Sequence, residues 1–362
     1  MNYQEAVAAF RAHVAMHEAN GVYFPEATAY LPDEWKRDYT LAMDAQPSFA
    51  TDPNSAVPAL FTTMVDPAVY EVLFSPNKAA VIFGEERKGT WLDEAVLFPT
   101  VEHAGEVSSY GDYNENGTAT VNADWPARQA YLFQTLLQYG ERELARAGLA
   151  KINWVSEVNK SAATLLNKYQ NLTYFFGVNG LNNYGALNDP LLPASITPAI
   201  KANGGTGWIK SGAINATANE IYADIEALYL QLVNQTSGLI DQESKLTLAL
   251  APGPAVALTA TNSFNVNVSD LLRKNFPNIR VETAMQYGQI STANPQGIAA
   301  GNLVQLIADE IEGQKTGFCA FNEKARAHKI IQQTSSFKQK ITAGSWGFVL
   351  RMPIGIASML GV

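Results

Sequence analysis

The chain has 362 residues, a formal net charge of −9 at pH 7 and a sequence pI near 5.0. The acidic net charge and the absence of any Lys/Arg block argue against a broad basic surface that binds nucleic acid. Only 16% of its residues are charged, below the roughly 25% usual in soluble domains, which indicates that other subunits cover part of the surface. The length exceeds the roughly 250–300 residues that one core organises, so we expect two domains or one domain with long extensions.

The cysteine content and the length of the apolar runs indicate the cellular compartment and whether the chain enters a membrane. Cys319 is the only cysteine, so an internal disulfide is impossible and a reducing compartment is expected. No apolar run approaches the roughly 18 residues of a membrane span, and the N-terminal segment lacks the apolar stretch of a secretory signal. We therefore expect no membrane partner.

The first part of the chain predicts an arm followed by short elements. Residues 1–56 begin with a short amphipathic helix and continue as an extended arm rich in Pro and Asp. Asp66 and Pro67 are the N-cap and first residue of a predicted helix. Residues 79–84, AAVIFG, have the composition of a strand that ends at glycine.

Residues 85–125 predict a long two-stranded ribbon around a turn-rich centre. Asn116-Gly117 is a typical hairpin dipeptide. The polar strands offer little core, and an isolated two-stranded ribbon is marginal in water. We expect the ribbon to lie on a neighbouring subunit.

Two helices are predicted next. Residues 126–148 form the longer one, which begins after Asp124 and ends at Gly148. Apolar residues from Trp154 to Tyr169 hold a 3.6-residue period and predict the second helix.

The stretch FFGVNGLNNYGALNDP, residues 175–190, resembles a phosphate-binding loop only in its glycines. A phosphate loop needs Lys-Ser/Thr at a helix start, and a dinucleotide fingerprint needs a preceding strand. Here a helix precedes and prolines follow, so a tight connector permitted by Gly and Asn is the better interpretation. We expect Phe175, Phe176 and Tyr184 to be exposed.

From about residue 196 the pattern changes to alternating helices and strands. Helices are expected over 217–236, over 269–277 with Ser269 as the cap, and over 302–313. Strands are expected over 245–251, 264–268 and 316–322. The final run, 346–362, is β-prone, with Pro353 indicating an edge or a break.

Candidate catalytic residues are few. His13 and His17 lie four apart on the predicted N-terminal helix, but Gly21 stands where the zincin pattern needs its second histidine, so two surface histidines are the better interpretation. His103 and His328 belong to no motif, and no G-x-S-x-G elbow is present.

The remaining candidates also have structural interpretations. The adjacent acids Glu85/Glu86 and Asp309/Glu310 would point in different directions on a strand or a helix, so we expect them on solvated surface. Cys319 lies in an apolar run and is expected to be a buried small hydrophobe. We expect no enzyme activity, no metal and no cofactor.

The order of these segments resembles the major capsid proteins of tailed bacteriophages. An arm, an unsupported ribbon, a long helix and an α/β domain closing on an apolar strand are shared with the Hong Kong ninety-seven phage fold, which encapsulin shells also use. The resemblance extends to SSYGDYNENGTATVNADWPARQAYLFQTLLQYGERELARAGLAKINW, NLTYFFGVNGLNNYGALNDP, NVNVSDLLRKNFPNIRVE and GFVLRMPIGIASMLGV, and covers roughly residues 60–362.

The resemblance implies an α+β fold with named segments. These are the N-terminal arm (1–56), the start of the P domain (57–84), the E-loop ribbon (85–125), the P domain with a spine helix at 126–148 (126–195), the A domain (196–339) and the C-terminal strand region (340–362).

It also implies a function. The chain would build hexamers and pentamers of an icosahedral virion shell, assembled in the bacterial cytoplasm, that encloses double-stranded DNA without sequence-specific binding. Implied partners are copies of itself, a scaffolding protein and a portal, with decoration proteins as a further candidate. The expected inter-subunit contact residues are Tyr110, Asn116, Gly117, Arg128, Asn182, Asn183 and Tyr184.

One family feature is not carried over. The type member cross-links its subunits through a Lys–Asn bond, but Lys88, near the base, is the only lysine of the ribbon. Two alternatives stay open, an encapsulin-like compartment and a soluble α/β enzyme with an unrecognised site.

Overall fold

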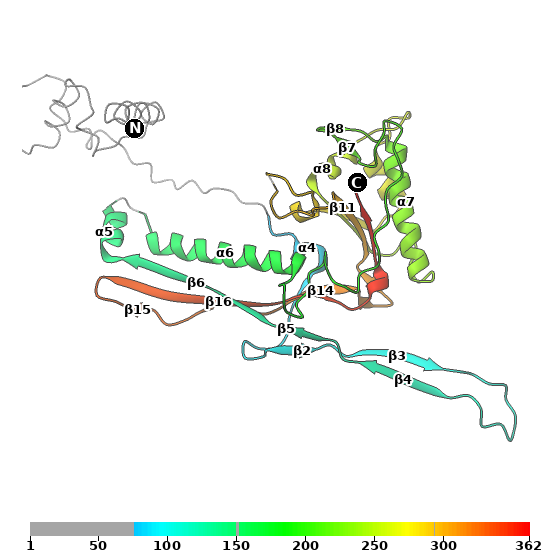
Figure 1. The fold of residues 1–362 in the computed structure, drawn as a ribbon, viewed down its shortest axis with the longest axis horizontal. Helices are drawn as coiled ribbons and strands as arrows, with labels where there is room; N and C mark the ends of the chain where they lie inside the picture. The colour runs from blue at the N-terminus through cyan, green and yellow to red at the C-terminus, as the bar shows by residue number, and fades with distance from the viewer. Residues whose placement is uncertain (1–75, 150–151, 293) are drawn as a thin grey trace, which may run out of the picture. The chain divides into compact units, whose positions relative to one another are not determined.

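Two β-sheets organise the described part of the chain. The computed structural model describes residues 76–149, 152–292 and 294–362, which fall in one compact unit, Val69–Val362. The predictions for the arm, for the helix after Asp66 and for His13 and His17 concern residues outside this range. A five-stranded and a four-stranded sheet contain most of the described strands (Figure 1).

The five-stranded sheet is built around one long strand, β16 (Ser336–Leu350). Along one edge β16 pairs with β14 (Gly317–Ala327) and β15 (Ile331–Gln332), and along the other with β6 (Tyr131–Gly140). β1 (Glu85–Arg87) pairs in parallel with β14. The strand predicted at 316–322 is confirmed as part of β14.

Helix α6 (Trp154–Phe176) lies along one face of this sheet (Figure 1). The Asn153 side chain caps it by accepting a hydrogen bond from the Ser156 amide at 3.3 Å. Its apolar stripe packs Ala162 and Leu166 in one cluster with Ile341 of β16. The helix predicted from its 3.6-residue period is confirmed and extends to Phe176.

The predicted helix at 126–148 is wrong for most of its length. Residues 127–140 form β5 (Ala127–Gln129) and β6, and only α5 (Glu141–Leu149) is helical. The 10 residues of β6 pair with β16, and its odd-numbered side chains are covered while most even-numbered ones are exposed. Tyr131 and Phe133 share the face that contacts Tyr169 of α6, a period-two pattern typical of strands. The long helix of this region is therefore α6.

The ribbon predicted at 85–125 is confirmed in its strands. β3 (Thr100–Gly105) pairs antiparallel with β4 (Ala119–Asp124), and β2 (Ala95–Leu97) pairs with β5 at the base. The first residues of the predicted ribbon are instead β1 of the main sheet.

The four-stranded sheet forms a second core with strand order β10-β9-β11-β17. The inner strands, β9 (Leu246–Leu250) and β11 (Leu303–Ala308), are buried along their whole length. β10 (Ile279–Thr283) and β17 (Ile356–Leu360) form the edges. The strand predicted at 245–251 is confirmed. The final apolar run is also confirmed as strands, with a 3₁₀ turn at Pro353–Gly355 between β16 and β17.

Helix α7 (Ala218–Gln235) confirms the helix predicted at 217–236 and packs on this sheet. Thr217 and Glu220 form a capping box at its start, and Ile221, Ile225 and Leu228 enter the core. Shorter elements complete the unit, namely α8 (Pro252–Ala257), the 3₁₀ turn η2 (Met285–Tyr287) and the small hairpin of β7 (Ile209–Lys210) and β8 (Ala213–Ile214).

The prediction for residues 264–277 is partly wrong. Helix α9 spans Val268–Asn275, and its cap is the Asn267 side chain, which accepts from the Asp270 amide at 2.7 Å, rather than Ser269. The predicted strand at 264–268 is absent, because the Asn262 side chain accepts hydrogen bonds from the Phe264 and Val266 amides and holds a turn there.

The helix predicted at 302–313 is wrong because a buried strand occupies half of it and a hairpin most of the rest. β11 is followed by a hairpin of β12 (Glu310–Ile311) and β13 (Gln314–Lys315), turned at Glu312 and Gly313, whose φ angles are 50° and 76°. Apolar residues of a strand buried on both faces form a continuous run that helical spacing also fits.

The strand predicted at 79–84 is also wrong, because a helix forms there. Residues Ala79–Phe83 form the short helix α4, with Ala79, Ile82 and Phe83 buried at helical spacing. The Asn171 side chain of α6 accepts a hydrogen bond from the Ala79 amide at 3.0 Å, which fixes the start of α4 in the core.

Candidate functional site

The β3–β4 ribbon exposes both of its faces. All residues of β4 and all but one of β3 are exposed. The cross-strand pairs place Val101, His103 and Val121 on one face, and Glu102 and Asp124 on the other. Val101 and Val121 remain 55% and 54% exposed, so the ribbon has an apolar face that the described residues leave uncovered.

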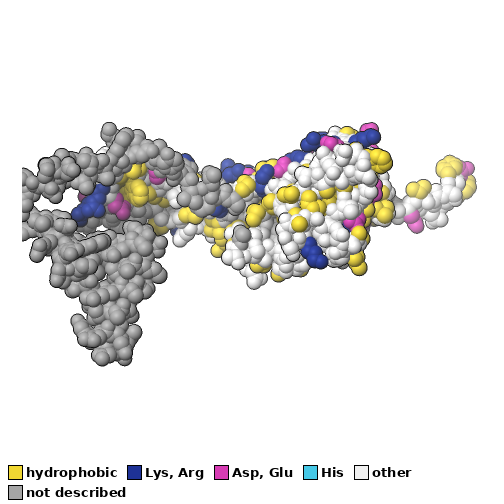
Figure 2. All heavy atoms as spheres, turned by 90° about the horizontal axis from the view of Figure 1, so that it is seen from above, with side chains coloured by type: hydrophobic (Ala, Val, Ile, Leu, Met, Phe, Trp, Pro, Cys, Tyr) yellow, Lys and Arg dark blue, Asp and Glu magenta, His cyan; other side chains and the backbone are white. Residues whose placement is uncertain are grey.

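The ribbon ends in a tip, residues 106–118, that combines aromatic and acidic side chains. Gly117 has φ 93°, as the predicted Asn-Gly turn requires, and the Ser108 hydroxyl donates to the Asn116 carbonyl at 2.6 Å. Tyr110 and Tyr113 are 93% and 101% exposed. Figure 2 shows the tip at the right-hand end, where yellow hydrophobic and magenta acidic side chains lie together.

The base of the ribbon packs on the five-stranded sheet. Val96, Phe98 and Ala130 contact a cluster that includes Phe318 and Trp346, on the face opposite α6. The Trp346 indole donates to the Lys88 carbonyl at 2.9 Å. Contacts within this chain therefore fix the base of the ribbon, while β3, β4 and the tip are largely exposed.

A buried ion pair anchors the base to the loop after α6. Arg128 of β5 donates to the Asp189 carboxylate at 2.6 Å, and both side chains are almost fully buried. The guanidinium carbon of Arg128 lies 4.8 Å from the centre of the Tyr184 ring. Because a buried charge is tolerated only when it is paired, this ion pair holds β5 against the loop.

Neighbouring amides reinforce the same junction. The Asn183 side chain donates to the carbonyls of Gln129 at 3.1 Å and Ser345 at 3.0 Å, and so links β5, the loop and β16. Asn182 contacts β5 through its backbone, whose N–H donates to Gln129 Oε1 at 3.0 Å.

The expected contact residues therefore fall into two groups. Tyr110, Asn116 and Gly117 lie at the exposed tip. The other four, Arg128, Asn182, Asn183 and Tyr184, lie together at the base. Arg128 and Asn183 are buried within this chain, which gives them an anchoring role; contact of any of the seven with another subunit stays a prediction.

Sequence reasoning missed the partners Asp189, Gln129 and Ser345. Asp189 lies 61 positions from Arg128, and Ser345 lies 162 positions from Asn183. No local pattern links residues so far apart. The nearest local signal for Asp189 is the Asn-Asp-Pro sequence that ends the glycine-rich stretch.

The stretch at 175–190 is the tight connector that was predicted. Gly177 ends α6 with φ 64°, and a Cβ at this position would lie 2.2 Å from the Asn183 carbonyl oxygen. The expectation that Phe175 is exposed is wrong, because it lies in the last turn of α6 and is buried in the core at 0% exposure. Phe176 and Tyr184 are half-buried.

The adjacent acids Glu85 and Glu86 are ion-paired rather than simply solvated. Hydrogen bonds from Lys315 and Lys88, each at 2.8 Å, lower the pKa of Glu86 to about 2. Glu85 pairs with Lys324 and accepts from the Tyr174 hydroxyl at 2.7 Å. Lys88, the only lysine of the predicted ribbon, is thus engaged at its base.

Other titratable groups are structural as well. Burial raises the pKa of Asp309, although Thr247 donates to it at 2.6 Å. Cys319 is buried as expected, and burial raises the pKa of its thiol. His103 lies opposite Val121 in the ribbon, and His328 contacts the Thr342 hydroxyl at 3.0 Å.

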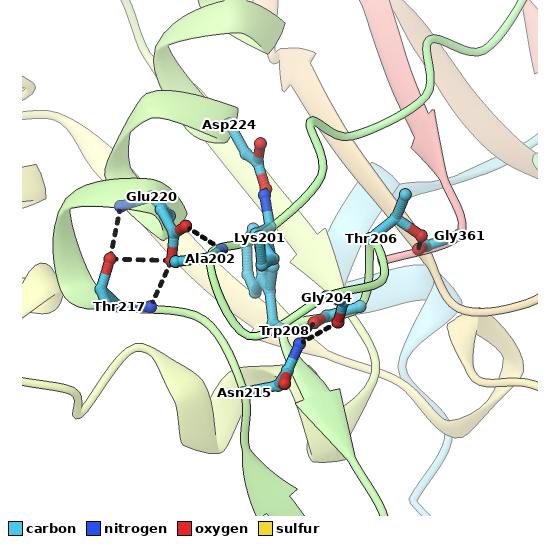
Figure 3. A network of polar contacts seen from close by, with 11 residues as sticks. Lys201, Ala202, Gly204, Thr206, Trp208, Asn215, Thr217, Glu220, Asp224 and Gly361 are labelled. Atoms are coloured by element: carbon cyan, nitrogen blue, oxygen red, sulfur yellow. Dashed lines mark hydrogen bonds and ion pairs between the residues drawn. The ribbon is translucent and has the colours of Figure 1, made fainter.

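A buried polar network in the second core joins an ion pair to a tryptophan indole (Figure 3). Lys201 pairs with Asp224 of α7, and the Trp208 indole donates to the same carboxylate oxygen at 2.6 Å. All three side chains are buried. The network ties the loop before β7 to α7.

Within residues 76–149, 152–292 and 294–362, no group of three or more His, Cys, Asp or Glu side chains is placed to hold a metal ion. No described helix is long and apolar enough to cross a membrane.

Comparison with known proteins identifies the family. The model of the Pa193 gp26 major capsid protein family matches residues 48–361. The chain belongs to this family. It is a major capsid protein of a tailed bacteriophage, as the resemblance implied. No curated protein sequence matches it.

Solved structures agree with this capsid protein in fold. A chain from the capsid of Myoviridae phage XM1 has a TM-score of 0.65 at 13% identity, over 84% of this chain and 99% of that one. A chain from the capsid of a native gene transfer agent (GTA) particle has 0.55 at 11% identity, over 88% and 99%. One from Gordonia phage Cozz has 0.52 at 8% identity, over 82% and 90%. The α+β capsid fold is therefore confirmed.

Proposed function

We propose that this capsid protein assembles with copies of itself into hexamers and pentamers of an icosahedral shell, in the host cytoplasm, around double-stranded DNA. Its role is structural, without catalysis. We further propose that residues 85–125 act as the E-loop, the regions at 126–195 and 196–339 as the P and A domains, and that a scaffolding protein and a portal take part in assembly.

The observation that carries the proposal is the exposure of the ribbon. A two-stranded ribbon with apolar Val101 and Val121 open to water is unstable by itself and gains stability when a surface covers it. A shell supplies that surface, because each copy donates one ribbon and receives another.

The test is assembly of the expressed chain, with its scaffolding protein where needed, observed by electron microscopy. Phage-like heads that take up DNA would support the proposal, whereas small particles that enclose proteins would favour an encapsulin-like compartment. A chain that stays monomeric under all assembly conditions would contradict both.

The turn of the ribbon provides a specific variant. Replacing Asn116 and Gly117 together by Val should impair particle formation more than monomer folding, because Gly117 has a positive φ in an exposed turn. Thermal unfolding of the unassembled chain is the control. An equal loss of folding and assembly would show that the ribbon belongs to the monomer's own core.

A further inference from the structure

Three Asn-Gly pairs lie in the described part of the chain, Asn116-Gly117, Asn179-Gly180 and Asn203-Gly204. Asparagine is one of the chemically labile residues of proteins. A following glycine increases this lability, because glycine has no side chain to shield its backbone nitrogen from the asparagine side chain. The fold places the three pairs in different surroundings, so their reactivity should differ.

The reaction of such a pair consumes only water. The glycine nitrogen loses its proton and bonds to the asparagine Cγ, while the bond from Cγ to Nδ2 breaks and ammonia leaves with the proton. Water then opens the resulting succinimide ring at either carbonyl, and an aspartyl or isoaspartyl residue remains. Both products carry a new negative charge, and in isoaspartate the main chain runs through the side chain and is one carbon longer.

Folding holds both reacting groups of the pair at 203. The Asn203 side chain donates to the Asn215 carbonyl at 2.8 Å, and the Gly204 N–H donates to the Lys201 carbonyl at 2.8 Å. Lys201 is itself fixed by its buried ion pair with Asp224. Both hydrogen bonds must open before this pair can react, even though the Asn203 side chain is exposed.

The pair at the tip of the ribbon is held in part. The Asn116 N–H donates to Asn114 Oδ1 at 3.0 Å, and the Asn116 carbonyl accepts from the Ser108 hydroxyl at 2.6 Å. These bonds restrain the Asn116 backbone on both sides of its Cα. The Asn116 side chain and the Gly117 N–H make no hydrogen bond with any described residue.

Asn179-Gly180 is the least restrained of the three pairs. It begins the turn at 179–182, which the Val178 N–H closes by donating to the Asn183 carbonyl at 2.9 Å. Within residues 76–149, 152–292 and 294–362, neither the Asn179 side chain nor the Gly180 N–H makes a hydrogen bond, and both residues are exposed. A Cβ at Gly180 would meet no atom within 4 Å, so the space around this glycine is open.

We propose that Asn179 is a site of spontaneous deamidation in the folded capsid protein, with Asn116 reacting more slowly and Asn203 protected. This modification is independent of the proposed function, because it needs neither assembly nor a partner. It makes the loop after α6 change covalently with time.

The change at Asn179 would affect the base of the ribbon. The hydrogen bond from the Leu181 N–H to the Val178 carbonyl, at 3.4 Å, spans the reacting pair. An additional main-chain carbon between these residues displaces the turn that ends at Asn183. Because the Asn183 side chain joins β5 to β16, isoaspartate at 179 should loosen this junction.

Peptide mapping of the unassembled, folded chain tests the assignment. The chain is kept in mildly alkaline buffer and digested, deamidation is measured by mass spectrometry, and isoaspartate is labelled with an isoaspartyl methyltransferase. We expect Asn179 to react first, Asn116 next, and Asn203 at least about tenfold more slowly than Asn179, because two hydrogen bonds protect it. In urea the three rates should approach one another, since no fold then distinguishes the pairs.

Hydrogen exchange tests the structural consequence. Exchange in β5 should be faster in the aged wild type than in the fresh protein. Asn179→Gln is the matched control, because glutamine keeps the amide but closes its larger ring much more slowly, and its exchange should not change with age. Fresh Asn179→Asp carries the charge without the longer main chain and should exchange like the fresh wild type.

Other outcomes overturn the inference. Equal rates at Asn179 and Asn203 in the folded chain would show that the hydrogen bonds at 203 give no protection. An intact Asn179 beside a modified Asn116 would show that the turn at 179–182 is itself protected. Unchanged exchange in β5 once isoaspartate has formed at 179 would contradict the effect on the base of the ribbon.

Discussion

Two paired β elements of this capsid protein differ in what stabilises them. Strands β9 and β11 are buried along their whole length between α7 and the rest of the second core. Strands β3 and β4 pair just as regularly, yet nearly all their side chains are exposed. Backbone pairing alone therefore does not determine how stable a strand pair is. Burial of apolar surface contributes about 25 cal/mol per Å² to the stability of β9 and β11, and β3 and β4 lack this contribution.

The largest effect is expected in the second core. Replacing Asp224 by Ala leaves Lys201 and the Trp208 indole buried without a partner. The free energy of unfolding should fall by about 3–5 kcal/mol, measured by denaturant titration of the unassembled chain. Lys201→Met combined with Asp224→Leu is the control and should recover much of this loss. A loss below about 1 kcal/mol in Asp224→Ala would show that the network is not needed.

At the base of the ribbon, Arg128→Ala should lower the free energy of unfolding by about 2–4 kcal/mol. The Asp189 carboxylate would then stay buried with only the Leu191 amide, at 3.0 Å, as a donor. Hydrogen exchange should increase in β2 and β5 and stay unchanged in β9. Unchanged exchange at the ribbon base would contradict the anchoring role.

A smaller, pH-dependent effect is expected at β1. The folded pKa of Glu86, about 2, is below its ordinary value near 4.5, so its ion pairs stabilise the fold above pH 4.5 and lose this contribution as pH falls towards 2. Because the site is partly exposed, Glu86→Gln should cost less than about 1 kcal/mol at pH 7. The difference from the wild type should vanish near pH 2; a constant difference would exclude this carboxylate as its cause.

The smallest effect on folding is expected in the ribbon. Val121→Ala should change the free energy of unfolding by no more than about 0.5 kcal/mol, because this side chain packs against no core. Its matched variant in the second core, Leu248→Ala, should cost about 2–5 kcal/mol. Denaturant titrations of both variants compare the regions directly, and equal losses would mean that the ribbon is part of the monomer's core.

Local signals in the sequence predicted the elements that local interactions specify. The periods of α6 and α7 and the Asn116-Gly117 turn all depend on residues a few positions apart. The failures share another cause. β6 was expected to be a helix because its apolar residues fit both periods, and pairing with β16, some two hundred positions later, decides between them.

The sequence by itself determined the segment order, the unsupported ribbon and the absence of recognisable catalytic motifs, and these sufficed for the resemblance to phage capsid proteins. Only the tertiary structure decided that residues 131–140 and 303–308 are strands and that Arg128 meets Asp189. The physical reason is separation along the chain, because burial and charge pairing between distant residues leave no local pattern.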